Sequence, residues 1–263
     1  FGVRPSEMHS SEIYDPATRR FSPAAISSTA PDLDRHDAIL LPDGKVLLHG
    51  GFNPPELFDP QTLTYKAIDY PFRPLAATAS VRLPNGQILM TGGSIAIYDP
   101  PSNTFAVSPN TARPNGLMDH ELTVLSDGRA ATVGGTYYSY AGDPSNQVDI
   151  YDPRTNSNRP EGVLSWPRSW HRVTRLPGDL LFVSGGEVGP SEYEWATERT
   201  EFYDPQLRKS AAGPFMRVPR TIHTSTLLMD GTVLITGGYT NVNCKGRCGL
   251  SSAELFIPAQ PVA

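Results

Sequence analysis

One pattern of apolar and polar positions occurs five times along this chain of 263 residues. Each copy has a mostly apolar run, a short polar turn, a second run that is almost wholly apolar, and a Gly-Gly pair. The copies align without a gap, and each reaches its Gly-Gly pair fourteen residues after its first residue. Repetition at this spacing predicts one supersecondary unit used several times. The copies begin at His36, Thr78, His120, His171 and His223.

Each repeat predicts four short strands. The second run is nearly all apolar, which is typical of a strand buried on both faces. Four copies place a two-residue Asp-Gly or Asn-Gly turn before it, whereas the fourth has Gly178-Asp179 and predicts a different turn. A third strand ends in an aromatic-Asp-Pro motif, because proline cannot continue a central strand. A short polar fourth strand suits the outer edge of a sheet.

These motifs resemble the bacterial form of the kelch repeat, which has an R-x-x-H start, an L-P-D-G turn, Gly-Gly and aromatic-Asp-Pro. The R-x-x-H motif is complete at Arg168–His171 and at Arg220–His223. The pattern is also similar to the propeller domain of galactose oxidase and glyoxal oxidase. The resemblance covers nearly the whole chain and implies an all-β fold, a kelch-type β-propeller in which residues 1–263 form one domain. It implies little about function, because propellers serve many.

Strand counting predicts five four-stranded blades closed by an N-terminal strand. The last repeat lacks a fourth strand, and a strand at residues 19–24 could pair with residues 253–256 to hide the open edge. One third-type strand, in SSEIYDP, is then surplus. The alternative is therefore a fragment of a six- or seven-bladed propeller.

Composition narrows the classes of partner. The formal net charge is -5, without a block of like charges, so the sequence predicts neither nucleic-acid binding nor attraction to an anionic membrane. No apolar run approaches the roughly 18 residues of a spanning helix, so membrane insertion is not expected. Cys244 and Cys248 bracket the short loop CKGRC. A disulfide there would indicate a secreted or other extracytoplasmic protein; half a metal site or free thiols are the alternatives.

Four of the six histidines occupy one repeat position, and the first strand of a propeller blade lies nearest the axis. Neutral imidazoles that converge there could bind a transition metal such as copper or zinc. The alternative is a structural role, in which each imidazole joins neighbouring blades through hydrogen bonds. The candidate metal ligands are His36, His120, His171 and His223.

The resemblance to the copper oxidases also defines what this chain lacks. In those enzymes a copper-binding histidine at this position follows a tyrosine ligand, and a cysteine is cross-linked to a second tyrosine. Here Arg35, Asp119, Trp170 and Ile222 precede the histidines. Oxidase chemistry is therefore disfavoured, and no catalytic residue is assigned. A metal-dependent oxidoreductase related to galactose oxidase remains the alternative to a protein without catalysis.

Two long segments lengthen the third and fourth repeats, at Thr136–Gln147 and Glu187–Thr200. Long loops on a rigid scaffold commonly carry recognition, and Tyr and Trp give large contact areas for sugars or proteins. Solvated loops with aromatics packed on the blade are the alternative. The sequence thus predicts an extracytoplasmic binding propeller for a carbohydrate or protein, with candidate contacts Tyr137, Tyr138, Tyr140, Tyr193 and Trp195. Asp32, Asp34 and Asp37 lack the spacing of a calcium loop and are expected to cap turns.

Overall fold

The computed structural model describes residues 10–26, 37–50, 53–70, 79–108, 116–137, 143–189, 195–242, 244 and 246–258. Contacts along the chain define two compact units, Phe1–Val107 and Ser108–Ala263. Whether residues 1–263 behave as one domain stays a prediction. No helix in the described part is long and apolar enough to cross a membrane.

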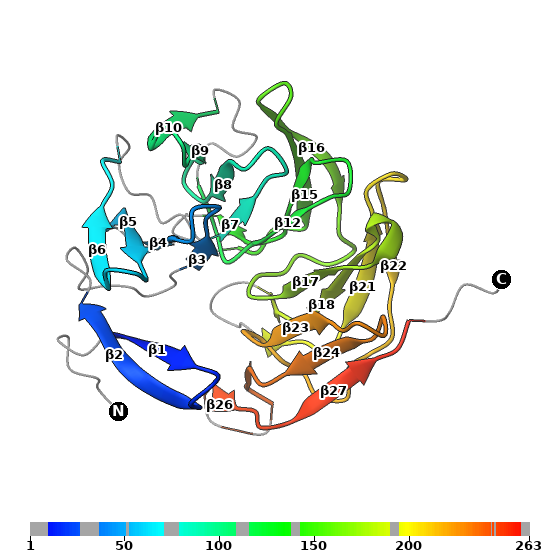
Figure 1. Ribbon diagram of the computed structural model, residues 1–263. Coiled ribbons are helices and arrows are strands. Elements are labelled where there is room, and N and C mark those ends of the chain that lie inside the picture. The colour runs from blue at the N-terminus through cyan, green and yellow to red at the C-terminus, as the bar shows by residue number, and fades with distance from the viewer. Residues whose placement is uncertain are drawn as a thin grey trace. The chain divides into compact units, whose positions relative to one another are not determined.

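Unit 1 contains a hairpin of β1 and β2 and two four-stranded antiparallel sheets, which we call blade 1 and blade 2 (Figure 1). Within each blade the strands pair in the order in which they follow one another in the sequence. The strands are β1 (Ser10–Asp15), β2 (Arg20–Ile26), β3 (Asp37–Leu40), β4 (Val46–Gly50), β5 (Asn53–Asp59), β6 (Thr64–Ala67), β7 (Ala79–Arg82), β8 (Ile88–Thr91), β9 (Ile95–Asp99) and β10 (Thr104–Val107).

Unit 2 contains three further sheets. Blade 3 is β12, β13, β15 and β16; blade 4 is β17, β18, β21 and β22; blade 5 is β23, β24 and β27. Their bounds are β12 (Glu121–Val124), β13 (Ala130–Val133), β15 (Gln147–Asp152), β16 (Ser157–Val163), β17 (Arg172–Arg175), β18 (Leu181–Ser184), β21 (Thr200–Asp204), β22 (Lys209–Ala212), β23 (Thr224–Leu227), β24 (Val233–Thr236) and β27 (Ala253–Phe256).

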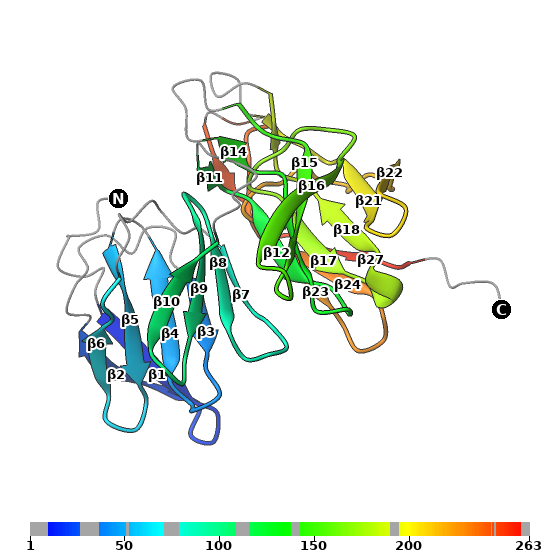
Figure 2. The ribbon, with the colours of Figure 1, turned by 90° about the horizontal axis from the view of Figure 1, so that it is seen from above.

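Each blade of unit 2 also has a two-stranded extension, which we call an insertion ribbon. Figure 2 labels the ribbon of blade 3. In every ribbon one strand directly follows the Gly-Gly pair of its blade. The ribbons pair β11 (Leu117–Met118) with β14 (Thr136–Tyr137), β19 (Glu187–Val188) with β20 (Trp195–Ala196), and β25 (Tyr239–Thr240) with β26 (Cys248–Gly249).

The predicted fold class is confirmed: the protein is an all-β β-propeller with five antiparallel blades. In the described part of the chain blade 5 has three strands, and β2 pairs with β1 across the Asp15–Pro16 turn. Because β2 belongs to unit 1 and β27 to unit 2, closure of the last blade by an N-terminal strand stays a prediction.

The second strand of each blade supplies the core, as its apolar composition predicted. Every residue of β8, β13 and β18 is buried. Leu125, Val133 and Val148 of blade 3 pack with Val183 and Tyr203 of blade 4 in one apolar cluster. Burial on both faces therefore holds neighbouring blades of unit 2 together.

The expected two-residue Asp-Gly turn is wrong. The Gly44 N–H donates to the carbonyl oxygen of Leu41 at 3.0 Å, and the Leu41 N–H donates to Lys45 at 2.8 Å. Only the glycine has a positive φ, of 86°, so the loop is a hydrogen-bonded turn followed by a left-handed glycine. The fourth copy does differ, because Gly178 and Asp179 both have positive φ in a short 3₁₀ turn.

The turn after each aromatic-Asp-Pro motif places the fifth residue past the aromatic in the left-handed region, with φ of 49–56°. Asparagine suits this conformation. In blades 2 and 3 it also accepts a hydrogen bond, because Tyr98 donates to Asn103 at 2.9 Å and Tyr151 donates to Asn156 at 3.0 Å. Blade 4 has Arg208 there instead. The buried Tyr203 hydroxyl has no hydrogen-bond partner within the described ranges, and burial raises its pKa to about 12.

We expect Arg208→Asn to stabilise unit 2 by about 1 kcal/mol, since it relieves left-handed strain and gives Tyr203 an acceptor. The exposed ion pair of Arg208 with Glu161, at 3.1 Å, is lost at little cost. Urea unfolding measures the change. Arg208→Gln is the matched control, because it removes the same ion pair without the short amide; equal stability of the two variants would contradict the prediction.

Candidate functional site

Two of the predicted recognition residues, Tyr137 and Trp195, lie on insertion ribbons. Trp195 lies on β20 and is 54% exposed. Tyr137 lies on β14, is half-buried, and its hydroxyl is 3.5 Å from Oε1 of Gln147. Tyr138, Tyr140 and Tyr193 lie outside the described residues. Of the five predicted contacts, Trp195 is thus placed at an exposed position.

The ribbon of blade 4 has two faces. Glu187 pairs with Ala196, and both are buried, whereas Val188 pairs with the exposed Trp195. Successive residues of a strand point to opposite faces, so Trp195 and Glu187 lie on opposite sides of this ribbon. Its inner strand is fixed to the chain that enters blade 4: the Ser169 N–H donates to Glu187 at 3.1 Å, and the Glu187 N–H donates to Ser169 at 2.7 Å.

The ribbon of blade 5 is joined to that of blade 4 by an ion pair and a hydrogen bond. The Arg247 guanidinium donates to both carboxylate oxygens of the buried Glu187, at 2.9 and 3.0 Å. The Ala196 N–H donates to Oδ1 of Asn241 at 3.0 Å. Arg247 lies inside the loop closed by Cys244 and Cys248, whose Cα atoms are 6.5 Å apart in a disulfide. The predicted disulfide is confirmed, and it restrains the loop that bears Arg247.

A second exposed aromatic residue lies on the ribbon of blade 5. We call the exposed side of the ribbons of blades 4 and 5 the rim. Tyr239 on β25 is 42% exposed, and its backbone N–H and carbonyl oxygen both bond to Thr221. Sequence reasoning missed Tyr239, although it stands directly after a Gly-Gly pair like Thr136 and Glu187. Braced backbone and exposed rings are what a preformed recognition surface requires.

The residues directly before the histidines connect the blades of unit 2. Asp119, Trp170 and Ile222 all have left-handed backbone, with φ of 57°, 54° and 53°. The Trp170 N–H donates to Asp119 at 3.0 Å, and the Ile222 N–H donates to Trp170 at 3.0 Å. Equivalent positions of three blades are therefore linked directly through the backbone, just inside the ribbons. The sequence predicted a circle of equivalent residues but not this backbone chain.

His171 and His223 are fully buried at the junctions between blades. Each imidazole packs against the first glycine of the preceding blade: a Cβ on Gly134 would lie 2.6 Å from His171, and one on Gly185 would lie 2.9 Å from His223. Nε2 of His223 is 2.9 Å from the Ser184 hydroxyl. Burial, with Arg172 and Arg220 adding to it, lowers the pKa of His223 to about 3. Burial likewise holds the pKa of His171 well below its usual range.

The four-histidine metal site stays a prediction. His120 is also buried, and His36 lies outside the described residues. Within the described ranges no three His, Cys, Asp or Glu side chains gather as a metal site. For His223, hydrogen bonding and packing between blades account for the neutral imidazole.

A buried arginine fixes the entry to blades 4 and 5. Arg168 donates through Nη1 to the Gly185 carbonyl oxygen and through Nη2 to Glu201, both at 2.7 Å. The other oxygen of Glu201 accepts the Ser165 N–H at 2.7 Å. Arg220 repeats this arrangement in blade 5, with Gly237 and Glu254, each at 2.8 Å. These are the arginines of the two complete R-x-x-H motifs.

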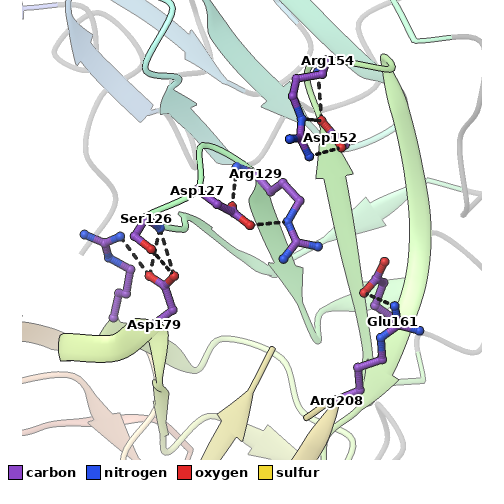
Figure 3. Close-up of polar contacts among 9 residues, drawn as sticks. Ser126, Asp127, Arg129, Asp152, Arg154, Glu161, Asp179 and Arg208 are labelled. Atoms are coloured by element: carbon purple, nitrogen blue, oxygen red, sulfur yellow. Dashed lines mark hydrogen bonds and ion pairs between the residues drawn. The ribbon is translucent and has the colours of Figure 1, made fainter. Parts of the chain in front are cut away.

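The hairpin turns of blades 3 and 4 carry charges that pair locally (Figure 3). Arg129 bonds Asp127 at 2.7 Å and Arg154 bonds Asp152 at 2.8 Å. Asp179 accepts the Ser126 N–H at 2.9 Å, which joins the turn of blade 4 to that of blade 3. These contacts brace turns, so the ribbons are the better candidate for recognition.

The comparisons agree with this architecture. No family model matches the sequence. The chain is 26% identical over 137 residues to kelch domain-containing protein 2 of Bos taurus, a match that covers 49% of this chain and 32% of that protein. In structure it is similar to a fungal alcohol oxidase of the AA5 family in complex with copper, with a TM-score of 0.72 and 17% identity. That match covers 91% of this chain and 56% of the oxidase.

The predicted resemblance to kelch-type propellers of the galactose oxidase kind is thereby confirmed at the level of fold. The chain spans about a third of the curated relative and little more than half of the solved oxidase. Copper is a property of that oxidase. In this chain the side chains before the described histidines are those of Asp119, Trp170 and Ile222, and none of them offers the phenolate ligand that the resemblance implies.

Proposed function

We propose that this protein is a non-catalytic, extracytoplasmic binding propeller that recognises a carbohydrate through the insertion ribbons of unit 2. The observation that carries the proposal is the exposure of Trp195 on a ribbon whose other face is fixed by the Arg247–Glu187 ion pair. An indole ring offers a flat apolar face for a sugar at a low cost in conformational entropy. The extracytoplasmic location rests on the Cys244–Cys248 disulfide.

A protein ligand is the second candidate. Tyr239 and Val242, 42% and 39% exposed, enlarge the apolar part of the rim, and aromatic residues are frequent in protein interfaces. The carbohydrate is favoured because the exposed indole of Trp195 offers a flat face of the size of one sugar ring.

The test is a glycan array followed by calorimetry with the neutral oligosaccharides that bind. We expect Trp195→Ala to weaken binding by at least about tenfold, as for a central aromatic contact. Phe21→Ala is the matched control, because Phe21 is an exposed aromatic of β2 and belongs to unit 1, whereas the ribbons belong to unit 2. Equal affinity of both variants would reject the ribbon site, and an array without any hit would favour the protein ligand.

A further inference from the structure

A separate group of exposed or half-buried side chains lies in the connections before, within and after blade 4. Trp166 follows β16, Arg199 precedes β21, and Phe215 follows β22. Cζ of Arg199 is 4.3 Å from the centroid of the Trp166 ring and 5.9 Å from that of Phe215. These distances are those of cation–π contacts, which hold the guanidinium plane against the rings.

The two rings hold the guanidinium of Arg199 in place, but no described carboxylate neutralises its charge. Among the described residues its N–H groups have no hydrogen-bond acceptor and no carboxylate within ion-pair distance, whereas Arg247 and Arg154 each bond a carboxylate. Stacking uses the faces of the guanidinium and leaves its N–H edge available for a planar anion. The Arg217 side chain is exposed and likewise has no described partner.

The rings beside Arg199 remain accessible. Trp166 is 46% exposed and Phe215 is 66% exposed. Phe215 and Arg217 also line an open pocket of about 330 Å³, whose floor includes the buried Phe182 and Ile235. Arg199 thus presents a cation between two exposed rings, next to a recess, with no carboxylate partner among the described residues.

We infer that Trp166, Arg199 and Phe215 form a subsite for an acidic sugar of a polysaccharide. Arg199 binds the carboxylate through two parallel N–H···O bonds, and the free parts of the two rings pack against the apolar faces of the sugars. A sulfate ester presents the same anionic chemistry. Nucleic acid does not fit, because the net charge is -5 and the cations are two separate guanidinium groups and not a basic stripe.

This inference rests on the proposed function for its ligand class, but it uses none of the ribbon residues. It predicts selectivity for acidic over neutral polysaccharides, which the ribbon site alone does not require. Because the chain carries an overall negative charge, attraction must come from the local contacts and should weaken as salt is added.

The experiment is calorimetry of the whole chain with three hexasaccharides: hexagalacturonate, a sulfated galactan and neutral galactan. We expect the acidic ligands to bind, and Arg199→Gln to weaken that binding by at least about tenfold. Trp166→Ala should have a similar effect. Arg208→Gln is the matched control, because it removes an exposed arginine of the same blade; circular dichroism checks that each variant is folded.

Every outcome decides the inference. Loss of hexagalacturonate binding in Arg199→Gln supports a uronate ligand, and loss of sulfated galactan binding alone identifies a sulfate ester. Equal binding by Arg199→Gln and Arg208→Gln, or no binding of either acidic ligand, overturns it. Binding of neutral galactan that Trp195→Ala abolishes and Arg199→Gln leaves intact would overturn the subsite while the proposed function stands.

Discussion

Replacing Arg168 with alanine is expected to lower the free energy of unfolding of unit 2 by about 3–5 kcal/mol. Arg168 and Glu201 are both buried, and their ion pair spans 2.7 Å. Without the guanidinium, the Glu201 carboxylate is a buried charge whose described side-chain partner is gone, and the Gly185 carbonyl oxygen loses a donor. Leaving a buried charge uncompensated is costly, which is why the expected loss is large.

Urea denaturation at pH 7 measures this loss. Arg154→Ala is the matched control, because Arg154 pairs with Asp152 at 2.8 Å but its side chain is 73% exposed, so at most about 1 kcal/mol should be lost. The double variant Arg168→Met with Glu201→Leu should recover much of the stability, since it removes both charges. If Arg168→Ala costs no more than Arg154→Ala, the buried pair is not the anchor that we infer.

The strands of this protein were predictable because their signal is local and repeated. Buried second strands such as Leu181–Ser184 are apolar at every internal position, and the Asp-Pro motif ends the third strand of blades 1 to 4. The ribbons were not predictable as strands, because two residues such as Trp195–Ala196 carry no periodicity. Their pairing depends on tertiary contacts, including the bond between Ala196 and Asn241.

The role of the histidines could be read only in part. Their repeat position was evident from the sequence. The hydrogen bonding of each imidazole, however, depends on which residue stands before the Gly-Gly pair of the preceding blade. Ser184 supplies a hydroxyl to His223, whereas blade 3 has Val133 at that position, and both ring nitrogens of His171 lack partners among the described residues. The same repeat position therefore gives two different environments: one histidine ring lies beside a hydroxyl group and the other does not.

For the arginines a usable signal was present. Both complete R-x-x-H motifs occur in repeats whose third strand has a glutamate two residues before the aromatic, Glu201 and Glu254. The first repeat has Glu56 at this position but Leu33 in place of the arginine, so the arginine is the informative member of the pair. The third repeat has Leu117 and Asp149 at these positions. Joint presence of a cation and an anion at fixed repeat positions indicates contact, even without an alignment of relatives. No such signal marked Arg199, because its partners are aromatic rings in different connections.

The second large effect is expected at the Gly-Gly pairs. Gly186 has a φ of +97°, and a Cβ there would lie 2.6 Å from the Ser169 carbonyl oxygen and 2.8 Å from Cβ of His171. Neither neighbour can move easily, because Ser169 is bonded twice to Glu187 and His171 is fully buried. Gly186→Ala therefore combines backbone strain with a steric clash against backbone, and should cost at least about 3 kcal/mol.

Gly231→Ala separates the two causes. Gly231 also has a positive φ, of +84°, but nothing lies within 4 Å of a Cβ placed on it. Its alanine variant should lose only the strain of the left-handed backbone, about 1–2 kcal/mol. Thermal and urea unfolding of both variants measure the difference, which we attribute to the close approach between the Gly-Gly pair and the chain entering blade 4. Similar losses in the two variants would mean that this approach relaxes freely, and that the ribbons are not held as rigidly as a preformed binding surface requires.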